Sequence, residues 1–338
     1  MKSSFTNERI LVSAIIPTYN RGYIVGKAID SILNQTYDNI EVIVVDDGST
    51  DNTLEKLKEY GDRIRFVSQA NSGPAAARNH GIAVSRGEII AFLDSDDIWL
   101  PTKIERQVSL LESVPNSVPC CLCNGITTTP GAKWSAFDMG LFYPDCEEGL
   151  WLNVTEVLAT RFILFCQLVA IRRDALERAG YFDPSLRFME DYDLALRLSL
   201  EGPWGFIQEP LAAMNLIPED SLTLKVLKEQ VCHAEYTLKT REHVFATLQS
   251  KDKNATGLAY LNQAIKRARR ELWGARLRES NRRGVQVVGN FFKRLERYRM
   301  AIYRRSPSFP KVKTARIERR INIPIADVAE AELQTEYF

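Results

Sequence analysis

The sequence predicts an α/β protein in which a mostly parallel central sheet is flanked by helices. Over residues 11–111, short apolar runs alternate with segments of helical spacing, which is the order of a parallel α/β sheet. Polar clusters follow several of these runs, where the expected strands end. Because ligands bind beyond the carboxyl ends of strands in such sheets, these clusters mark the expected functional site.

The expected strands of this half are short and rich in β-branched residues. Residues 40–45 read Ile-Glu-Val-Ile-Val-Val, a composition that favours a strand. The first run, Leu-Val-Ser-Ala-Ile-Ile-Pro, ends at a proline. The four expected strands cover residues 11–17, 40–45, 63–68 and 88–93.

Helical spacing of apolar residues fills the intervals between these strands. Asp51 is a candidate N-cap for the second helix, and Pro101 suits the first turn of the fourth. The expected helices cover residues 24–33, a segment after Asp51, residues 74–84 and residues 101–111.

Beyond residue 113 the elements are harder to predict. A buried strand is expected over residues 118–123, a helix over residues 194–200 and a last strand near residues 206–215. The three cysteines within residues 118–123 lack a second Cys or His pair at zinc-binding spacing, so we interpret them as buried small residues. Several aromatic residues could either stack on sugar rings or cover the core: Trp134, Phe137, Phe142, Tyr143, Trp151 and Trp204.

The charges are unevenly divided along the chain. Its 338 residues hold 44 Lys+Arg and 43 Asp+Glu, a net charge of +1. Residues 263–320 alone hold 19 basic and 4 acidic residues, a local +15 that leaves −14 for the remainder. The average therefore conceals an acidic body and a basic tail.

Nothing in the sequence predicts a membrane span or an export signal. The longest nearly apolar run, residues 162–171, is about half the length needed to span a bilayer. We therefore expect a cytoplasmic protein, peripheral on the inner face of the membrane if its basic tail binds lipid. The six cysteines are expected to be reduced.

Acidic residues gather at two of the expected strand ends. Asp46 and Asp47 follow the second strand, and residues 94–97 read Asp-Ser-Asp-Asp after the fourth. A single Asp there suits a turn, but three carboxylates in four positions repel one another unless a cation relieves them. An Asp-x-Asp pair suits Mg²⁺ or Mn²⁺ with positions left for diphosphate oxygens. The absence of a P-loop and of Gly-x-Gly-x-x-Gly argues against those nucleotide folds.

Four strings resemble the motifs of the family 2 inverting glycosyltransferases, in order and spacing, and the resemblance covers residues 11–215. They are Val-Ser-Ala-Ile-Ile-Pro-Thr-Tyr-Asn-Arg, Glu-Val-Ile-Val-Val-Asp-Asp-Gly-Ser-Thr-Asp, Asn-Ser-Gly-Pro-Ala-Ala-Ala-Arg-Asn-His-Gly and Phe-Leu-Asp-Ser-Asp-Asp. The resemblance implies a GT-A fold, a nucleotide-diphosphate sugar donor, usually carrying uracil, and a Mn²⁺ or Mg²⁺ cofactor. It is not specific for the sugar.

The same resemblance implies roles for individual residues. Asp46 would accept a hydrogen bond from the base ring, Asp47 would support that pocket, and Asp94 would face the ribose. Asp96, together with Asp94, would hold the metal. The residues implied for the nucleotide are Pro17, Thr18, Tyr19, Arg21, Asp46, Asp47, Arg78, Asp94 and Ser95. Two simpler interpretations stay open: Tyr19 as a packed loop aromatic, and Arg78 and Asn79 as parts of a solvated helix face.

An acidic pair, Glu190 and Asp191, precedes the helical pattern of leucines. Helix capping is the simple interpretation. The resemblance implies that Asp191 is the general base, with Glu190 as the alternative. Inversion is a single in-line displacement, so a carboxylate must take the acceptor's proton while the metal and nearby cationic groups offset charge on the leaving diphosphate.

We expect a GT-A catalytic domain over residues 1–218, with a nucleotide-binding half (11–113) and an acceptor half (114–218). A helical basic extension (219–305), with a break at residues 251–256, and an extended or poorly ordered tail (306–338) would follow. The basic helices could dock on the catalytic domain or adhere to an anionic membrane carrying a lipid-linked or glycan acceptor. No motif suggests nucleic acid.

One segment departs from the family's pattern. Many relatives carry a basic or His-containing segment near the diphosphate, whereas residues 214–221 hold neither His nor Arg. Lys225 is a candidate substitute.

Two alternative functions are compatible with an acidic α/β site, and particular residues argue against each. A sugar nucleotidyltransferase should have a glycine-rich loop after the first strand, where this chain has Pro-Thr-Tyr-Asn. A non-catalytic carbohydrate-binding or scaffold protein would need no base, so the presence of Asp94, Asp96 and Asp191 argues against it. We predict a metal-dependent inverting glycosyltransferase of polysaccharide, lipopolysaccharide or other glycan synthesis.

Overall fold

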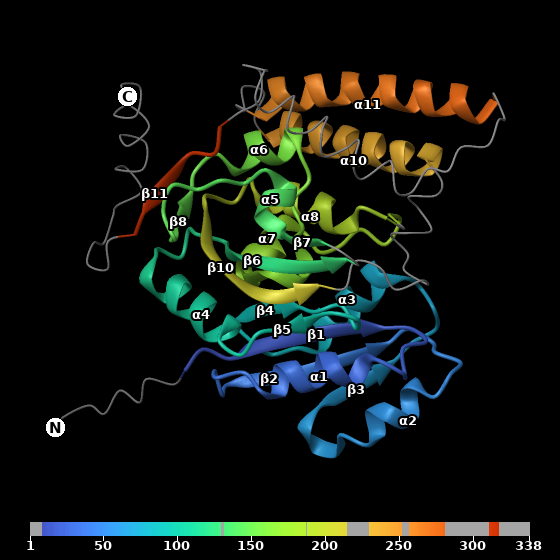
Figure 1. Cartoon of the computed structure of the whole chain (residues 1–338), viewed down its shortest axis with the longest axis vertical. Helices are drawn as coiled ribbons and strands as arrows, with labels where there is room; N and C mark the ends of the chain where they lie inside the picture. Colours follow the sequence, from blue (N-terminus) through green and yellow to red (C-terminus); the bar gives the residue numbers. More distant parts are fainter. Residues whose placement is uncertain are drawn as a thin grey trace.

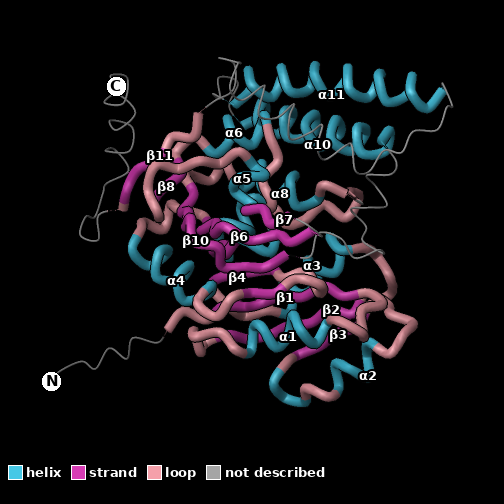
Figure 2. The backbone as a smooth tube through the Cα atoms, viewed as in Figure 1, coloured by secondary structure: helices cyan, strands magenta, loops and turns pink. Residues whose placement is uncertain are grey.

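The predicted fold class is confirmed by the computed structural model, in which a central sheet is flanked by helices and a helical hairpin lies along one side (Figure 1). The sheet runs in the order β11-β8-β10-β6-β9-β4-β1-β2-β3 and forms the middle layer of the molecule (Figure 2). The structure describes residues 9–129, 132–186, 188–214, 230–251, 257–280 and 311–317.

The first half of the sheet is parallel, as the alternation of apolar runs predicted. Its strands are β1 (Val12–Thr18), β2 (Ile40–Asp46), β3 (Arg65–Ser68) and β4 (Ile89–Phe92). They are connected through α1 (Val25–Leu33), α2 (Thr53–Lys58), the 3-10 turn η1 (Gly61–Arg63) and α3 (Pro74–Val84). Strands β2 and β3 lie on one side of β1 and β4 on the other, so the chain reverses direction across the sheet at β1. Ligands of open α/β sheets bind at such a switch point.

The second half of the sheet is mixed. Its strands are β5 (Ile98–Trp99), β6 (Cys120–Thr129), β7 (Ala132–Ser135), β8 (Glu148–Trp151), β9 (Val169–Arg172) and β10 (Trp204–Met214). The helical elements are α4 (Lys103–Ser113), α5 (Ala136–Gly140), α6 (Val154–Thr160), η2 (Cys166–Leu168), α7 (Arg173–Ala179) and α8 (Glu190–Leu198). Strand β9 runs antiparallel to both β4 and β6 and thereby joins the two halves into one sheet.

Most of the ambiguous aromatic residues belong to the core. Phe142 packs against Trp151 and Phe206, and Trp151 packs edge-on against Trp204, with all four rings essentially buried. Tyr143 is the exception, with 42% of its surface exposed. The side chain of Trp134 lies outside the described part. The cysteines of β6 are fully buried free thiols, as the absence of zinc spacing predicted.

Element boundaries differ from the predictions in small ways. Helix α2 begins at Thr53, so Asp51 lies one position before the N-cap residue, although its side chain still accepts from the Thr53 amide at 3.0 Å. Pro101 precedes α4 and does not form its first turn. Strand β9 uses the end of the apolar run 162–171, which the sequence had not predicted as a strand.

Two C-terminal helices, α10 (Gln230–Lys251) and α11 (Gly257–Ser280), lie side by side and pack on α8 and α6 (Figure 1). The predicted break at residues 251–256 lies, apart from Lys251, outside the described residues. Strand β11 (Thr314–Arg316), which was not predicted, adds to the sheet beside β8. The remaining expectations for residues 281–310 and 318–338 lie outside the described residues. Within the described residues, no helix is long and apolar enough to cross a membrane.

Candidate active site

The loops after β1 and β2 are fastened to one another by short-range hydrogen bonds. The Asp47 amide donates to the Thr18 carbonyl at 2.8 Å, and the Asn20 amide donates to Ser49 Oγ at 2.8 Å. Asn20 has a φ of +51°, a left-handed conformation that Asn tolerates better than most residues. These bonds place the predicted residues 17–21 directly beside the Asp46-Asp47 pair.

Asp46 and Asp47 are both buried, but they accept hydrogen bonds from different segments. Asp46 Oδ1 accepts from the Ser49 amide at 3.2 Å, within its own turn. Asp47 accepts from Gln69 Nε2 at 2.7 Å and from the amides of Ser72 and Gly73 at 2.9 and 2.8 Å. Because Gly73 is the N-cap residue of α3, Asp47 fixes the entry of that helix.

Helix α3 carries Arg78 into the middle of the site. A Cβ atom at Gly81 would come within 2.4 Å of Ile15 Cγ2, so glycine lets α3 lie close against β1. On the same helix, the Asn79 side chain donates to the carbonyl of Phe182 at 2.8 Å and accepts from its amide at 3.0 Å. Neither Arg78 nor Asn79 is a solvated surface residue. The sequence singled out both without showing which distant loop they contact.

Arg78 connects the acidic segment after β4 to the start of α8. Its Nη2 donates to Asp94 Oδ1 and its Nη1 to Glu190 Oε1, both at 2.8 Å. Its guanidinium also lies 5.3 Å from the centre of the Phe182 ring. Burial opposes the charge of Arg78, but the surrounding negative groups outweigh it, and its pKa stays well above the ordinary value. Residues 112 positions apart in sequence thus form one buried ion-pair group.

Asp191 lies beside this group with a pKa raised to about 7. Burial is the largest cause, and the neighbouring charge of Glu190 adds to it, while Arg78 and the Tyr192 amide, 2.7 Å from Asp191 Oδ1, act in the opposite direction. Asp191 keeps part of its surface accessible, whereas Glu190 is buried and already paired with Arg78. Of the two acids, Asp191 is therefore the one placed to accept a proton near neutral pH.

The acidic segment after β4 offers limited ligands for a metal. Asp96 Oδ2 lies 4.0 Å from Arg21 Nη2, and Asp94 is engaged by Arg78. Ser95 and Asp97 are buried. No group of three or more His, Cys, Asp or Glu is arranged to hold a metal within the described ranges. The donor set therefore fits a cation bound by one or two carboxylates with diphosphate oxygens completing its shell, as Mg²⁺ is commonly held.

Sequence reasoning placed most of these residues at one edge of the sheet but missed others. Thr18 is buried, and its Oγ1 has no hydrogen-bond partner among the described residues, whereas Tyr19 is 46% exposed. Phe182, which packs on Arg78 and is clasped by Asn79, was not predicted. No local signal marks it, because its role depends on contacts with a helix about a hundred positions earlier.

The comparison with protein families identifies the fold's class. Residues 13–177 match the sequence model of glycosyl transferase family 2. The matched segment, just under half of the chain, is that of a family 2 glycosyltransferase, and it lies in the sheet and helices described above.

Two curated proteins illustrate what the chain is similar to in sequence. An uncharacterised glycosyltransferase of Rickettsia typhi is 37% identical over 184 residues, which cover 54% of this chain and 57% of that protein. A UDP-Glc:α-D-GlcNAc-diphosphoundecaprenol β-1,3-glucosyltransferase of Escherichia coli is 46% identical over 103 residues, 30% of this chain and 41% of that protein. The chain thus spans about half the length of the curated relatives it matches.

Solved structures support the same fold. The crystal structure of S. aureus TarS residues 1–349 in complex with UDP-GlcNAc superposes with a TM-score of 0.58. The match covers 78% of this chain and 73% of that one at 17% identity. At this identity the likeness concerns the fold alone.

Proposed function

We propose that this protein transfers a sugar from a nucleotide-diphosphate donor, UDP-linked, to an acceptor hydroxyl with inversion at the anomeric carbon. One observation carries the proposal: Arg78 ties the carboxylate after β4 to the first turn of α8, where Asp191 has a pKa raised to about 7. In this proposal Asp94 lies on the side of the nucleotide sugar and Asp191, the proton acceptor, lies on the side of the acceptor hydroxyl, as a single displacement requires. The name of the E. coli relative, which specifies UDP-Glc, supports a UDP-linked donor.

The nucleotide would lie over the carboxyl ends of β1, β2 and β4. In this proposal the base ring donates to Asp46, and the unpartnered Thr18 Oγ1 supplies a further hydrogen bond. The exposed Tyr19 covers the base or ribose, and Arg21 lies toward the phosphates. Asp47 contributes indirectly, because its carboxylate is used in fixing α3.

The transfer step assigns different tasks to the carboxylates. Asp191 takes the proton of the acceptor hydroxyl as its oxygen attacks the anomeric carbon from the face opposite the diphosphate. Glu190, paired with Arg78, holds the first turn of α8 in place and raises the pKa of Asp191. Asp96 and Asp94 would hold Mn²⁺ or Mg²⁺, which when bound neutralises charge on the diphosphate. Residues 215–229, where Lys225 was suggested to approach the leaving group, lie outside the described residues.

The acceptor is proposed to be a glycan or a lipid-linked sugar at an anionic membrane. Support comes from α11, where Lys266, Arg270 and Trp273 are exposed at spacings that place them on one helix face, and Trp273 is 69% exposed. Basic side chains beside an exposed Trp suit the interface of an anionic bilayer. The diphosphoundecaprenol acceptor in the name of the E. coli relative points the same way.

Flotation tests the membrane part of this proposal. The full-length chain should float with vesicles of phosphatidylglycerol and phosphatidylcholine but not with phosphatidylcholine alone. A Lys266→Glu, Arg270→Glu variant should float less. Equal recovery with both vesicle types, or none with either, would contradict it.

The chemical proposal is tested by UDP release from a panel of UDP-sugars in the presence of Mn²⁺, with inorganic pyrophosphate measured in parallel. Release of UDP from at least one donor supports transfer. Pyrophosphate formed from a nucleoside triphosphate and a sugar phosphate would favour a nucleotidyltransferase instead. Carbohydrate binding with no product from any donor would favour a non-catalytic scaffold.

A further inference from the structure

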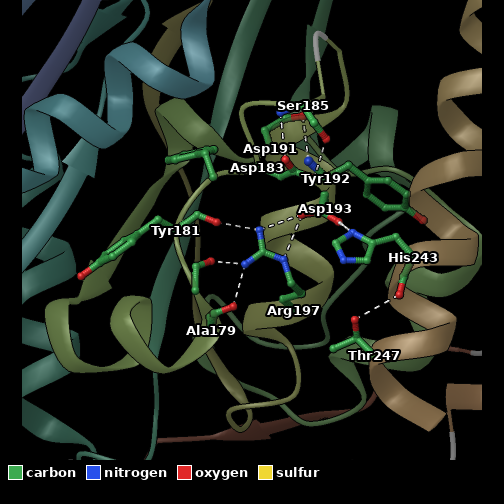
Figure 3. Close-up of polar contacts among 12 residues, drawn as sticks. Ala179, Tyr181, Asp183, Ser185, Asp191, Tyr192, Asp193, Arg197, His243 and Thr247 are labelled. Carbon is green, nitrogen blue, oxygen red and sulfur yellow. Dashed lines mark hydrogen bonds and ion pairs between the residues drawn. The ribbon is translucent and has the colours of Figure 1, made fainter. Parts of the chain in front are cut away.

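Helix α8 carries a second charged cluster, one turn beyond Glu190, that transfer does not use directly. Asp193 is fully buried, and its Oδ2 accepts from Arg197 Nε at 2.9 Å and Nη2 at 2.7 Å. Its Oδ1 lies 3.0 Å from Nδ1 of His243, which comes from α10 (Figure 3). One buried carboxylate thus connects the helix of the candidate base to the C-terminal hairpin.

Arg197 extends this cluster to the segment that leads into α8. Its Nη1 donates to the carbonyls of Ala179, at 2.6 Å, and Gly180, and its Nη2 donates to the Tyr181 carbonyl at 2.8 Å (Figure 3). These carbonyls form the end of α7 and the start of the following loop. The next residue, Phe182, is the one that packs on Arg78. The cluster therefore holds both ends of the connection between α7 and α8.

His243 is the contribution of α10 to this arrangement. The side chain is 46% exposed, so it covers the otherwise buried Asp193 from the solvent side. Thr240 and Val244, on the same helix, are fully buried and seat α10 against the domain. The Nδ1–H of either the charged imidazole or the appropriate neutral tautomer can donate to Asp193.

We infer, on the basis of the transfer proposed above, that His243 is a positioning residue that sets the first turn of α8 and thereby the aim of Asp191. The Asp193 amide donates to the Met189 carbonyl at 3.0 Å and closes the turn that contains Glu190 and Asp191. A lateral shift of Asp193 must therefore move that turn. Displacements of about 1 Å in a reacting group can cost about a hundredfold in rate. Through His243, the hairpin then supports the position of Asp191.

The test compares three substitutions on α10 in the full-length chain. His243→Ala should lower kcat about tenfold and leave the KM for the donor within about twofold, because α10 packs on α8 and α11 and the proposed nucleotide residues lie on other elements. His243→Asn should recover most of kcat, since its amide nitrogen can occupy the place of Nδ1. Glu242→Ala is the matched control: it removes the 2.7 Å pair with Arg269 inside the hairpin but leaves α8 untouched.

Hydrogen exchange of the amides at residues 188–193 gives a readout that needs no substrate. His243→Ala should speed exchange there, and Glu242→Ala should not. Wild-type kcat in His243→Ala with unchanged exchange, no recovery in His243→Asn, or equal losses in His243→Ala and Glu242→Ala would overturn the inference. If the wild type releases UDP from no donor while exchange responds as expected, the positioning role stands and the proposed transfer fails.

Discussion

Asp191 and Asp193 lie two residues apart at the start of one helix, yet their surroundings are opposite. Asp193 faces Arg197 and His243, which supply hydrogen bonds to both of its oxygens. Asp191 faces Glu190 and Arg78, accepts one backbone hydrogen bond, and has a pKa raised to about 7. The first arrangement holds a carboxylate in place through hydrogen bonds, and the second raises the pKa of a carboxylate toward neutral pH.

The difference shows that two Asp residues within one helical turn can have different roles, one in support of the fold and one proposed for proton transfer. Positions i and i+2 lie on roughly opposite faces of an α-helix. Asp191 therefore points toward the candidate active site, whereas Asp193 points toward Arg197 and His243. If the two faces differ in this way, substitutions at Asp191 and its neighbours should change turnover, pH dependence and stability to decreasing extents.

Asp191→Asn should lower kcat about a thousandfold, because it removes the proton acceptor while keeping the shape of the side chain. UDP binding, measured by calorimetry, should be unchanged, since the nucleotide loops lie on other elements. The exposed Asp62→Asn should retain normal turnover and serves as the control. Near-normal kcat in Asp191→Asn would remove the distinction between the two faces.

Arg78→Met should lower kcat/KM about a hundredfold and reduce the free energy of unfolding by roughly 3 kcal/mol, because it leaves Asp94 and the buried Glu190 unpaired. Arg78→Lys keeps the charge but cannot bridge both carboxylates in the same way, so it should recover only part of either loss. Kinetics and urea unfolding measure the two effects separately. Stability and rate both at wild-type level in Arg78→Met would show that the bridge is dispensable.

The pH dependence of kcat/KM should show an acid limb with an apparent pKa of about 7, below which the rate falls tenfold per pH unit as Asp191 becomes protonated. Glu190→Gln removes a negative neighbour that raises the pKa of Asp191, so the limb should move to lower pH. A limb that stays in place in that variant would mean that another group titrates.

The smallest effect concerns stability. The pKa of Asp191 is raised on folding from its ordinary 3.8 to about 7, so the folded state binds the proton more tightly than the unfolded state. The stabilising contribution is complete below pH 4 and is lost as pH rises through about 7. Asp191→Asn should therefore melt at a higher temperature than the wild type at pH 8, with the gap closing toward pH 4. A constant gap at all pH values would contradict the raised pKa.

The sequence predicted the parallel half of the fold well because buried parallel strands are continuous apolar runs with clear turn residues between them. Strands β9 and β11 were missed for a physical reason: each is only three or four residues long and forms through pairing with distant strands. Short segments of this kind have no periodicity of their own.

The candidate site was predictable in its local parts. Asp46, Asp94 and Asp191 follow strands or begin a helix, and motif order placed them together. The ion pairs of Arg78 and the contact of His243 with Asp193 join segments 112 and 50 residues apart, which no local pattern records. Asp94, Asp191 and Arg78 could therefore be named as candidates from the sequence, but the contacts that join them could not.

The most direct test of the contrast between the two faces is an NMR titration of the carboxyl carbons, with the Asp191 signal assigned by its absence in Asp191→Asn. This signal should titrate near pH 7 in the wild type and move to lower pH in Glu190→Gln. An Asp191 signal that titrates near pH 4 in both proteins would contradict this contrast.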